Sequence, residues 1–352
     1  MAHVTVIPGD GIGVDVTAEA VKVLRAAAAA FAFPLELEQL DYNADRFLRT
    51  GEAFPASALE RIRTGSDAVF LGAVGDPRIP DMTHAREILF GLRFGLDLYI
   101  NLRPVKCLHA SLMPLRDRRP EDVDLVFFRE NTEGLYVNMG GIFKKGTPHE
   151  VAINEDVNTR HGVERILRAA FEYARTHGRR KVTMADKSNA LRFAHDLWQR
   201  AFAEVGSEYQ DLEQEHLYVD ALAMQLIRKP QNYDVVVTCN MFGDILTDLG
   251  AALQGGLGMA ASGNIHPGRV SMFEPVHGSA PKYAGKDVAN PLAAILTAAM
   301  LLDHVGQARA GAAIEAAVSR ALAEHEVPKD LGGELGTCAM GDYIADAVTR
   351  SA

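Results

Sequence analysis

Short apolar runs rich in β-branched residues recur along the chain and alternate with longer stretches of helical periodicity. Five runs are typical of buried strands: "HVTVI" (3–7), "DAVFL" (67–71), "DLVFF" (124–128), "KVTMA" (181–185) and "DVVVT" (234–238). Apolar residues three and four apart predict helices over 15–31, 161–176, 190–205, 243–253 and 291–304. This alternation indicates an α/β fold whose central sheet is at least partly parallel.

Glycines and charged residues are concentrated directly after these runs. In chain order, the runs lead into "PGDGIG", "GAVGDP", "RENTEG", "DKSN" and "CNMFGD". Open α/β sheets bind ligands outside the carboxyl ends of their strands, so we expect the functional site there. "GDGIG" lacks the third glycine position of the dinucleotide fingerprint G-x-G-x-x-G and does not predict a standard Rossmann domain.

Length and composition narrow the class of protein. The chain has 352 residues, 48% of them hydrophobic, which is enough for one large or two medium domains. The formal net charge of −10 argues against a general nucleic-acid or anionic-membrane surface. We therefore expect neither nucleic acid nor membrane as a partner.

Cysteine usage and the N-terminal residues bear on location. Cys107, Cys239 and Cys338 show no paired spacing, which is typical of a reducing compartment. The longest early apolar run, 26–35, is about half the length that a membrane span requires, and no basic targeting region precedes it. A cytoplasmic, soluble protein is expected.

A pair of carboxylates points to a bound cation. "CNMFGDILTDLG" (239–250) places Asp244 and Asp248 four residues apart, on one face of the predicted helix. Asp220, in "YVDALAMQL", opens another helix, and oxygen donors of this kind suit Mg²⁺ or Mn²⁺. No Cys/His cluster with zinc spacing competes. The alternative is that these are ordinary aspartates stabilised by helix dipoles.

Cationic and proton-donating residues accompany the carboxylates. "LRFGLDLYINLRP" carries Arg93 and Arg103, and Arg129 opens "RENTEG"; guanidinium groups make forked contacts with carboxylates. Tyr136 in "EGLY" adds a phenol, and Lys187 in "DKSN" adds an amine that could act as a base if buried beside other cations. Taken singly, these would be surface charges and a core aromatic residue.

Together the motifs resemble the isocitrate/3-isopropylmalate dehydrogenase family of β-decarboxylating dehydrogenases. The motifs occur in the same order as in that family, nearly from end to end of the chain. They are "IPGDGIG", "NLRP", "RENTEGLY", "DKSN", "YVDALAMQL", "FGDILTDL", "FEPVHGSAP", "GKDVANP" and "DLGGELGT". The resemblance implies that family's two-domain α/β fold. Residues 1–99 and 255–352 would form a nucleotide-binding domain, and 100–254 a domain for substrate, metal and dimerisation.

The resemblance also implies a reaction and its residues. Such enzymes oxidise a 2-hydroxy acid with a neighbouring carboxylate, pass hydride to a nicotinamide and release CO₂. By position, Asp220, Asp244 and Asp248 would hold Mg²⁺ or Mn²⁺, Lys187 would take the hydroxyl proton and Tyr136 would protonate the enolate.

Further implied contacts concern the substrate, the partner subunit and the nucleotide. Arg93, Arg103 and Arg129 would bind substrate carboxylates. In the family, Lys187 and Asp220 reach into the partner's active site, where the aspartate also contacts substrate; this implies a homodimer, with residues 138–158 as its clasping arm. The nucleotide would lie on Ile12, Gly72, Ala73, Val74, Glu274, His277, Gly278, Ser279, Ala280, Lys282 and Asn290.

Substrate choice is expected on the helix before Arg93. Leu89 and Phe90, four and three residues earlier, suit a branched alkyl group and favour 3-isopropylmalate, converted to 2-oxoisocaproate in leucine biosynthesis. The alternative is that both simply pack in the core. Arg86 stands where isopropylmalate enzymes usually carry a glutamate, and the arm resembles that of tartrate dehydrogenases. Tartrate/malate and homoisocitrate/isocitrate therefore stay open as substrates.

The nucleotide is expected to be NAD, with NADP open. Lys282 and Tyr283 in "GSAPKYAG" resemble NADP-linked members, whereas isopropylmalate enzymes generally use NAD. A non-catalytic regulatory subunit should have lost some catalytic positions, and all are present here. An acidic metal-binding scaffold would not need the arginines.

Overall fold

The computed structural model describes residues 1–351 and divides into two compact units. The first comprises residues 1–98, 106–120 and the chain from 251 onward, and the second comprises 99–105 and 121–250. The segment 106–120, which the sequence placed with the middle domain, thus clusters with the first unit. No helix in the described part of the chain has the length and apolarity to cross a bilayer.

Five strands form the sheet of the first unit. Their order is β2 (Leu35–Gln39), β1 (Ala2–Gly9), β3 (Ala68–Ala73), β12 (Ser271–Pro275) and β11 (Ala261–Ile265). β1 pairs in parallel with both β2 and β3, and β12 runs parallel to β3. Only the β11–β12 pair is antiparallel among the pairings described in this unit. The expectation of a partly parallel α/β sheet is confirmed.

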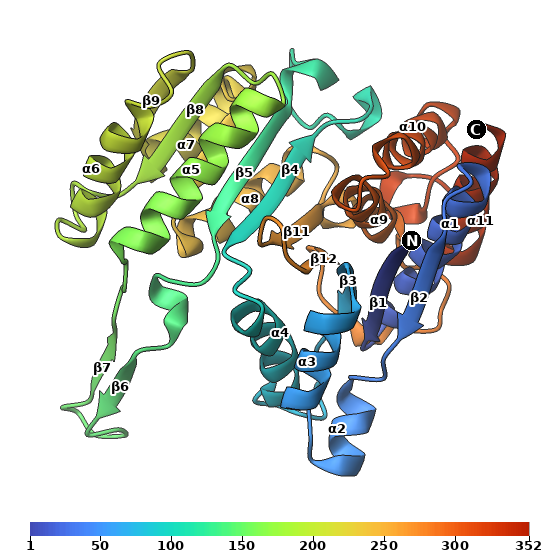
Figure 1. Ribbon diagram of the computed structural model, residues 1–352, viewed down its shortest axis with the longest axis horizontal. Coiled ribbons are helices and arrows are strands. Elements are labelled where there is room, and N and C mark those ends of the chain that lie inside the picture. The colour runs from blue at the N-terminus through green and yellow to red at the C-terminus, as the bar shows by residue number, and fades with distance from the viewer. Residues whose placement is uncertain (352) are drawn as a thin grey trace. The chain divides into compact units, whose positions relative to one another are not determined.

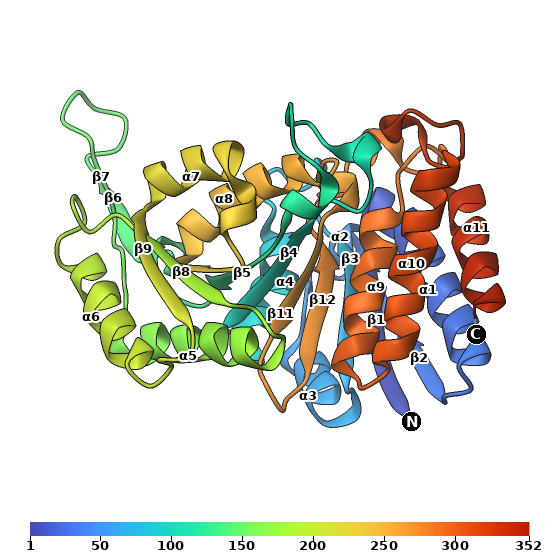
Figure 2. The ribbon, with the colours of Figure 1, turned by 90° about the horizontal axis from the view of Figure 1, so that it is seen from above.

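Helices cover both faces of this sheet. α1 (Ile12–Ala30), α9 (Leu292–His304), α10 (Ala308–Glu324) and α11 (Thr337–Arg350) lie together in both views (Figures 1 and 2). α9 is apolar on nearly every face, as expected of a helix packed between the sheet and other helices. α2 (Ala44–Thr50) is a short helix after β2, and α3 (Ala56–Gly65) and α4 (Thr83–Gly95) share a buried core with β3 and β12.

The second unit holds five further strands. Their order is β4 (Ile100–Lys106), β5 (Asp124–Glu130), β10 (Val235–Thr238), β8 (Lys181–Asp186) and β9 (Glu213–Tyr218). β10 runs parallel to β5 and β8, and β8 runs parallel to β9. The carboxyl ends of these four parallel strands therefore meet at one edge, where the motifs rich in charged residues follow.

Four helices pack around this second sheet. They are α5 (Arg160–Thr176), α6 (Ala194–Gly206), α7 (Val219–Arg228) and α8 (Asn240–Leu253). Apolar residues at helical spacing on α5, from Val163 to Ala174, are buried against β5 and β10. α6 begins at Ala194 rather than at the predicted 190, because a hydrogen-bonded turn occupies the residues before it.

A two-stranded hairpin extends from the second unit (Figure 1). β6 (Gly140–Phe143) and β7 (Val151–Asn154) pair antiparallel, and both strands are exposed throughout. Ile142, Phe143 and Ile153 are 50–65% exposed, although a lone hairpin in water is only marginally stable. The predicted arm thus forms a hairpin whose apolar side chains are uncovered in a single chain.

Candidate active site

Most of the predicted chemistry-bearing residues of the second unit lie at the carboxyl ends of its strands. Arg103 lies on β4 and Arg129 near the end of β5, Lys187 follows β8, and Asp220 follows β9. α8, which carries the aspartate pair, follows β10 after one residue. Because the parallel strands end at one edge, loops distant in sequence are brought to the same edge of the sheet.

Asp244 and Asp248 lie one turn apart on α8, as predicted. The guanidinium of Arg103 lies beside both of them, with Nη2 3.4 Å from Asp244 Oδ1 and Nη1 4.0 Å from Asp248 Oδ1. The side chain of Asp248 is 65% exposed and that of Asp244 is 38% exposed. The pair is therefore neutralised in part and still open to a ligand.

Arg129 is fixed beside Asp244 by the first residue of α8. Its Nε donates to the carbonyl of Asn240 at 2.9 Å, and its Nη2 donates to Asn240 Oδ1 at 2.8 Å. Its Nη1 donates to Asp244 Oδ1 at 2.5 Å. A Cβ on Gly243 would lie 2.4 Å from Cγ of Arg129, so only glycine lets this buried side chain cross the helix.

Tyr136 completes this cluster. Its hydroxyl donates to Asp244 Oδ2 at 3.1 Å, and the Arg129 guanidinium carbon lies 5.5 Å from its ring centroid. Burial, followed by the charge and hydrogen bond of Asp244, raises the pKa of Tyr136 above its ordinary value of 10. The phenol is therefore protonated at neutral pH and able to donate a proton.

Lys187 forms a separate pair with Asp220. Lys187 Nζ lies 2.5 Å from Asp220 Oδ1, and this ammonium lowers the pKa of the Asp220 carboxyl below its ordinary range. Both side chains are partly exposed. Sequence reasoning expected a lysine buried beside other cations, whereas one chain places it beside a carboxylate. Within the described chain, this amine therefore faces an anion.

The three predicted metal-binding aspartates are not one cluster within the chain. In the described residues, no group of three or more His, Cys, Asp or Glu side chains is arranged to hold a metal ion. The two α8 carboxylates have the oxygen chemistry that Mg²⁺ and Mn²⁺ prefer, and they are accessible. One chain thus provides a fitting but incomplete ligand set.

The predicted specificity residues lie on α4 in the first unit. Arg93 is buried, and its guanidinium carbon lies 5.6 Å from the ring centroid of Phe90, which stacks on Phe94. Leu89 packs against the core shared by α3, α4 and β3, as the alternative interpretation had it. Arg86 is exposed. Phe90 is half-buried beside Arg93.

Three loops of the predicted nucleotide site pack closely together in the first unit. The backbone N–H of Ile12 donates to the carbonyl of Ser279 at 2.7 Å. A Cβ on Gly72 would lie 2.2 Å from the carbonyl oxygen of Pro8, so the close pairing of β3 with β1 at this point requires glycine. The residues at and after the carboxyl ends of β1, β3 and β12 are thereby held at one edge of the sheet; they include Ala73, Val74 and Ala280.

A half-buried histidine in these loops has a buried ring nitrogen without a hydrogen-bond partner in the described chain. Nε2 of His277 has no hydrogen-bond partner within residues 1–351, and burial lowers the pKa of the ring. Beside it, a Cβ on Gly278 would meet open space. A neutral, buried donor or acceptor next to open space fits a bound ligand such as a nucleotide.

Other residues that were predicted to contact the nucleotide interact with neighbouring side chains. Asn290 Nδ2 donates to Asp330 Oδ2 at 3.0 Å, and Glu274 Oε1 accepts from Asn264 at 2.8 Å. Lys282 is exposed, with Nζ 4.7 Å from the ring centroid of Tyr283. Lys282 therefore presents a positive charge at the surface.

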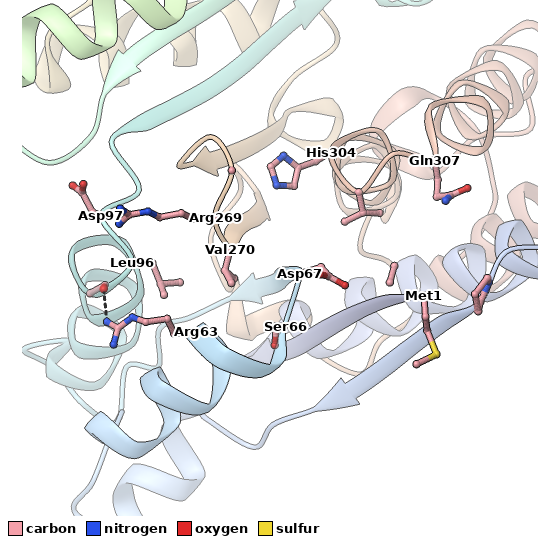
Figure 3. A pocket seen from close by; sticks show the side chains of 15 residues that line it. Met1, Arg63, Ser66, Asp67, Leu96, Asp97, Arg269, Val270, His304 and Gln307 are labelled. Atoms are coloured by element: carbon pink, nitrogen blue, oxygen red, sulfur yellow. Dashed lines mark hydrogen bonds between the residues drawn. The ribbon is translucent and has the colours of Figure 1, made fainter.

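A hollow of about 890 Å³ lies at the opposite edge of the first unit (Figure 3). Its walls include Ala2, Ser66, Asp67 and Val270, which lie at the amino ends of β1, β3 and β12. Most of the labelled side chains are exposed or half-buried, and Arg63 donates to the backbone carbonyl of Gly95. Ligands of such sheets bind at carboxyl ends, so this hollow is not the candidate active site.

Sequence reasoning missed two residues that shape the cluster. Asn240 holds Arg129, and Thr247 Oγ1 accepts from Arg103 Nη1 at 2.5 Å. Both lie in the quoted stretch "CNMFGDILTDLG", and Thr247 is three residues after Asp244 on the same helix. Helical spacing could have suggested Thr247, whereas Asn240 acts through a contact with a distant strand.

Comparisons with known proteins agree with this geometry. The sequence model of a family described as isocitrate/isopropylmalate dehydrogenase matches residues 3–344. A 3-isopropylmalate dehydrogenase of Thermobifida fusca is 48% identical over 347 residues, which cover 98% of this chain and 97% of that protein. A protein of the same description from Frankia casuarinae is 49% identical over 324 residues, covering 92% and 93%.

Solved structures give the same result. The crystal structure of isocitrate dehydrogenase from Methylococcus capsulatus superposes with a TM-score of 0.88 at 37% identity and covers 99% of this chain and 100% of that one. The TT0538 protein of Thermus thermophilus gives 0.87 at 38% identity, covering 98% of this chain and 68% of that one.

Proposed function

Since the chain belongs to the isocitrate/isopropylmalate dehydrogenase family, we propose that it oxidises and decarboxylates 3-isopropylmalate with NAD⁺. The product would be 2-oxoisocaproate, an intermediate of leucine biosynthesis. The observation that carries this is the cluster of Arg103, Arg129, Tyr136 and Asp244. It combines cations for substrate carboxylates, a carboxylate for a divalent cation and a protonated phenol.

Two anchored guanidinium groups would bind the substrate carboxylates. Arg129 keeps its fork fixed through Asn240, and Arg103 is fixed through Thr247, so little side-chain freedom is lost on binding. Their remaining N–H groups point at Asp244, whose carboxylate would instead bind the metal ion. A substrate carboxylate would take over these N–H groups. From the family resemblance, Arg93 contributes a third guanidinium.

The reaction needs charge stabilisation and two proton transfers. When bound, the nicotinamide supplies the hydride acceptor and the divalent cation supplies positive charge at the developing oxyanion. Lys187 takes the hydroxyl proton during oxidation. Tyr136 gives its proton to the enolate carbon after CO₂ leaves, and its raised pKa keeps that proton available.

We further propose a homodimer with shared active sites. Asp244 and Asp248 lack a third carboxylate, and Asp220 with Lys187 forms a pair of its own. A second copy that supplies Lys187 and Asp220 to the α8 aspartates would complete both sets. The exposed apolar hairpin of β6 and β7 is suited to pairing with its counterpart in that copy.

A substrate panel tests the proposal. We expect purified protein with Mg²⁺ to reduce NAD⁺ with 3-isopropylmalate at a higher kcat/KM than with isocitrate, homoisocitrate, tartrate or malate. Each acid is assayed with NAD⁺ and with NADP⁺. Lys282 at the surface favours the 2′-phosphate of NADP⁺, whereas the similarity to 3-isopropylmalate dehydrogenases favours NAD⁺. Absence of turnover with every acid would support a binding-only protein instead.

Replacing Phe90 with arginine should move substrate preference toward acids with a charged side chain. The substitution removes an apolar contact and adds a guanidinium beside Arg93. We expect kcat/KM for 3-isopropylmalate to fall about 10- to 200-fold, the range for such pocket changes, relative to isocitrate and homoisocitrate. Phe90→Leu is the matched control and should keep the original ranking. An unchanged ranking in Phe90→Arg would remove α4 from substrate choice.

A further inference from the structure

The backbone at Lys187 is held by a buried histidine that no step of the reaction uses. The N–H of Lys187 donates to Nδ1 of His195 at 3.0 Å. The carbonyl of Lys187 accepts from the N–H groups of Ala190 and Leu191 at 2.9 and 2.8 Å. His195 lies in the first turn of α6 and is 1% exposed. Both peptide groups of Lys187 are therefore fixed, one of them by an imidazole.

This hydrogen bond requires a neutral ring in one tautomer. Because the Lys187 N–H is a donor, Nδ1 must be an unprotonated acceptor, so the ring proton is on Nε2. Nε2 lies 3.8 Å from Asp156 Oδ2, too far for a hydrogen bond, and has no partner elsewhere in the described chain. Burial lowers the pKa of His195 despite the opposing charges of Asp186 and Asp156.

The surroundings make this contact rigid. Asp186, buried directly before the lysine, accepts from the N–H of Ser188 at 3.1 Å and from His216 at 2.8 Å. The His195 ring also packs against Phe242 of α8, with ring centroids 5.5 Å apart. His195 thus links the turn that carries Lys187 to the helix that carries Asp244.

We propose that His195 is a positioning residue for the catalytic lysine: its Nδ1 holds the peptide from which the Lys187 side chain starts. The inference rests on the proposed function, in which Lys187 is the base. A base that acts on one hydroxyl proton must be placed closely, and a misplacement of about 1 Å is known to cost ~10²-fold in rate. Releasing the N–H of Lys187 would let the turn shift without removing the amine.

Three substitutions separate hydrogen bonding from packing. His195→Asn places an amide oxygen near the position of Nδ1, His195→Gln places one near Nε2, and His195→Leu has no acceptor. We expect kcat of His195→Asn to stay within about threefold of wild type and kcat of the other two to fall about 10- to 100-fold. KM for the acid should change little in all three, because arginines bind it.

The outcomes distinguish this inference from the proposed function. If His195→Gln and His195→Leu turn over like the wild type while Lys187→Ala is inactive, the positioning role is wrong and the base assignment stands. If Lys187→Ala is also active, the base assignment fails. Equal losses in His195→Asn and His195→Leu would indicate packing alone and overturn the inference.

A measurement on the wild type does not depend on how the variants fold. The chain has 12 histidines, and a ¹⁵N spectrum of protein labelled in histidine, compared with His195→Asn, assigns the ring of His195. We expect protonated Nε2 and unprotonated Nδ1 from neutral pH to below the ordinary histidine pKa of about 6.5. The opposite tautomer, or a ring that is protonated at neutral pH, would overturn the inference.

Discussion

Replacing Lys187 with alanine is expected to lower kcat for 3-isopropylmalate by at least ~10²-fold, since a positioned acid or base typically contributes that much. The lysine directly follows β8 and pairs with Asp220 in the described chain, so its loss should leave the dimer intact. Steady-state NADH formation measures the rate, and size-exclusion chromatography measures the assembly.

Lys181 offers a matched control on the same strand. It lies at the amino end of β8, where it pairs with Glu213 and Glu215, away from the carboxyl-end cluster. Lys181→Ala should keep kcat near the wild-type value. If Lys187→Ala were no slower than Lys181→Ala, the base would have to be another residue.

Asp244→Asn should have an effect of similar or greater size. The amide keeps the shape of the side chain but removes the negative charge that attracts Mg²⁺ or Mn²⁺ beside Arg103 and Arg129. We expect kcat to fall about 10²- to 10³-fold, as when one stabilising group at an oxyanion is lost. The Mg²⁺ concentration for half-maximal rate should rise as well.

An exposed aspartate in the same unit provides the comparison. Asp211 forms a surface ion pair with Arg175, and Asp211→Asn should leave both rate and metal requirement unchanged. If Asp244→Asn kept the wild-type rate and metal dependence, α8 would not carry the cation.

β3, β5 and β10 were predictable because both of their faces are buried, which makes them continuous apolar runs. β4, β11 and β12 were missed, because each mixes polar with apolar residues. β2 ("LELEQ") and β9 ("EQEHLY") were missed, since they lie at the ends of the strand order and carry many polar residues. Their assignment depends on a neighbouring strand that no local pattern reveals.

The residues of the site likewise divide into those that the motifs revealed and those that they did not. Arg103, Arg129, Tyr136 and Asp244 were all named from motifs, and the structure brings these four together. The contacts that fix them come from residues with ordinary local patterns, such as Asn240, so spacing alone could not find them. The roles of Lys187 and the other site residues stay predictions that only kinetics can test.

The Lys187–Asp220 pair was also not foreseen, and it leads to the central claim. One chain has two carboxylates on α8 and a third on α7 that is bonded to the lysine, with no three-ligand group in the residues described. A complete site would therefore require two chains, each of which gives Lys187 and Asp220 to the Asp244 of the other.

A hybrid dimer of Lys187→Ala and Asp244→Asn chains, isolated with two different affinity tags, tests this directly. With shared sites, one active site keeps both residues, and the hybrid should regain about half of the wild-type rate although each parent homodimer is inactive. A hybrid of wild-type and doubly substituted chains should then be inactive. If the first hybrid were inactive and the second half-active, Lys187 would act with Asp244 of its own chain, contrary to this account.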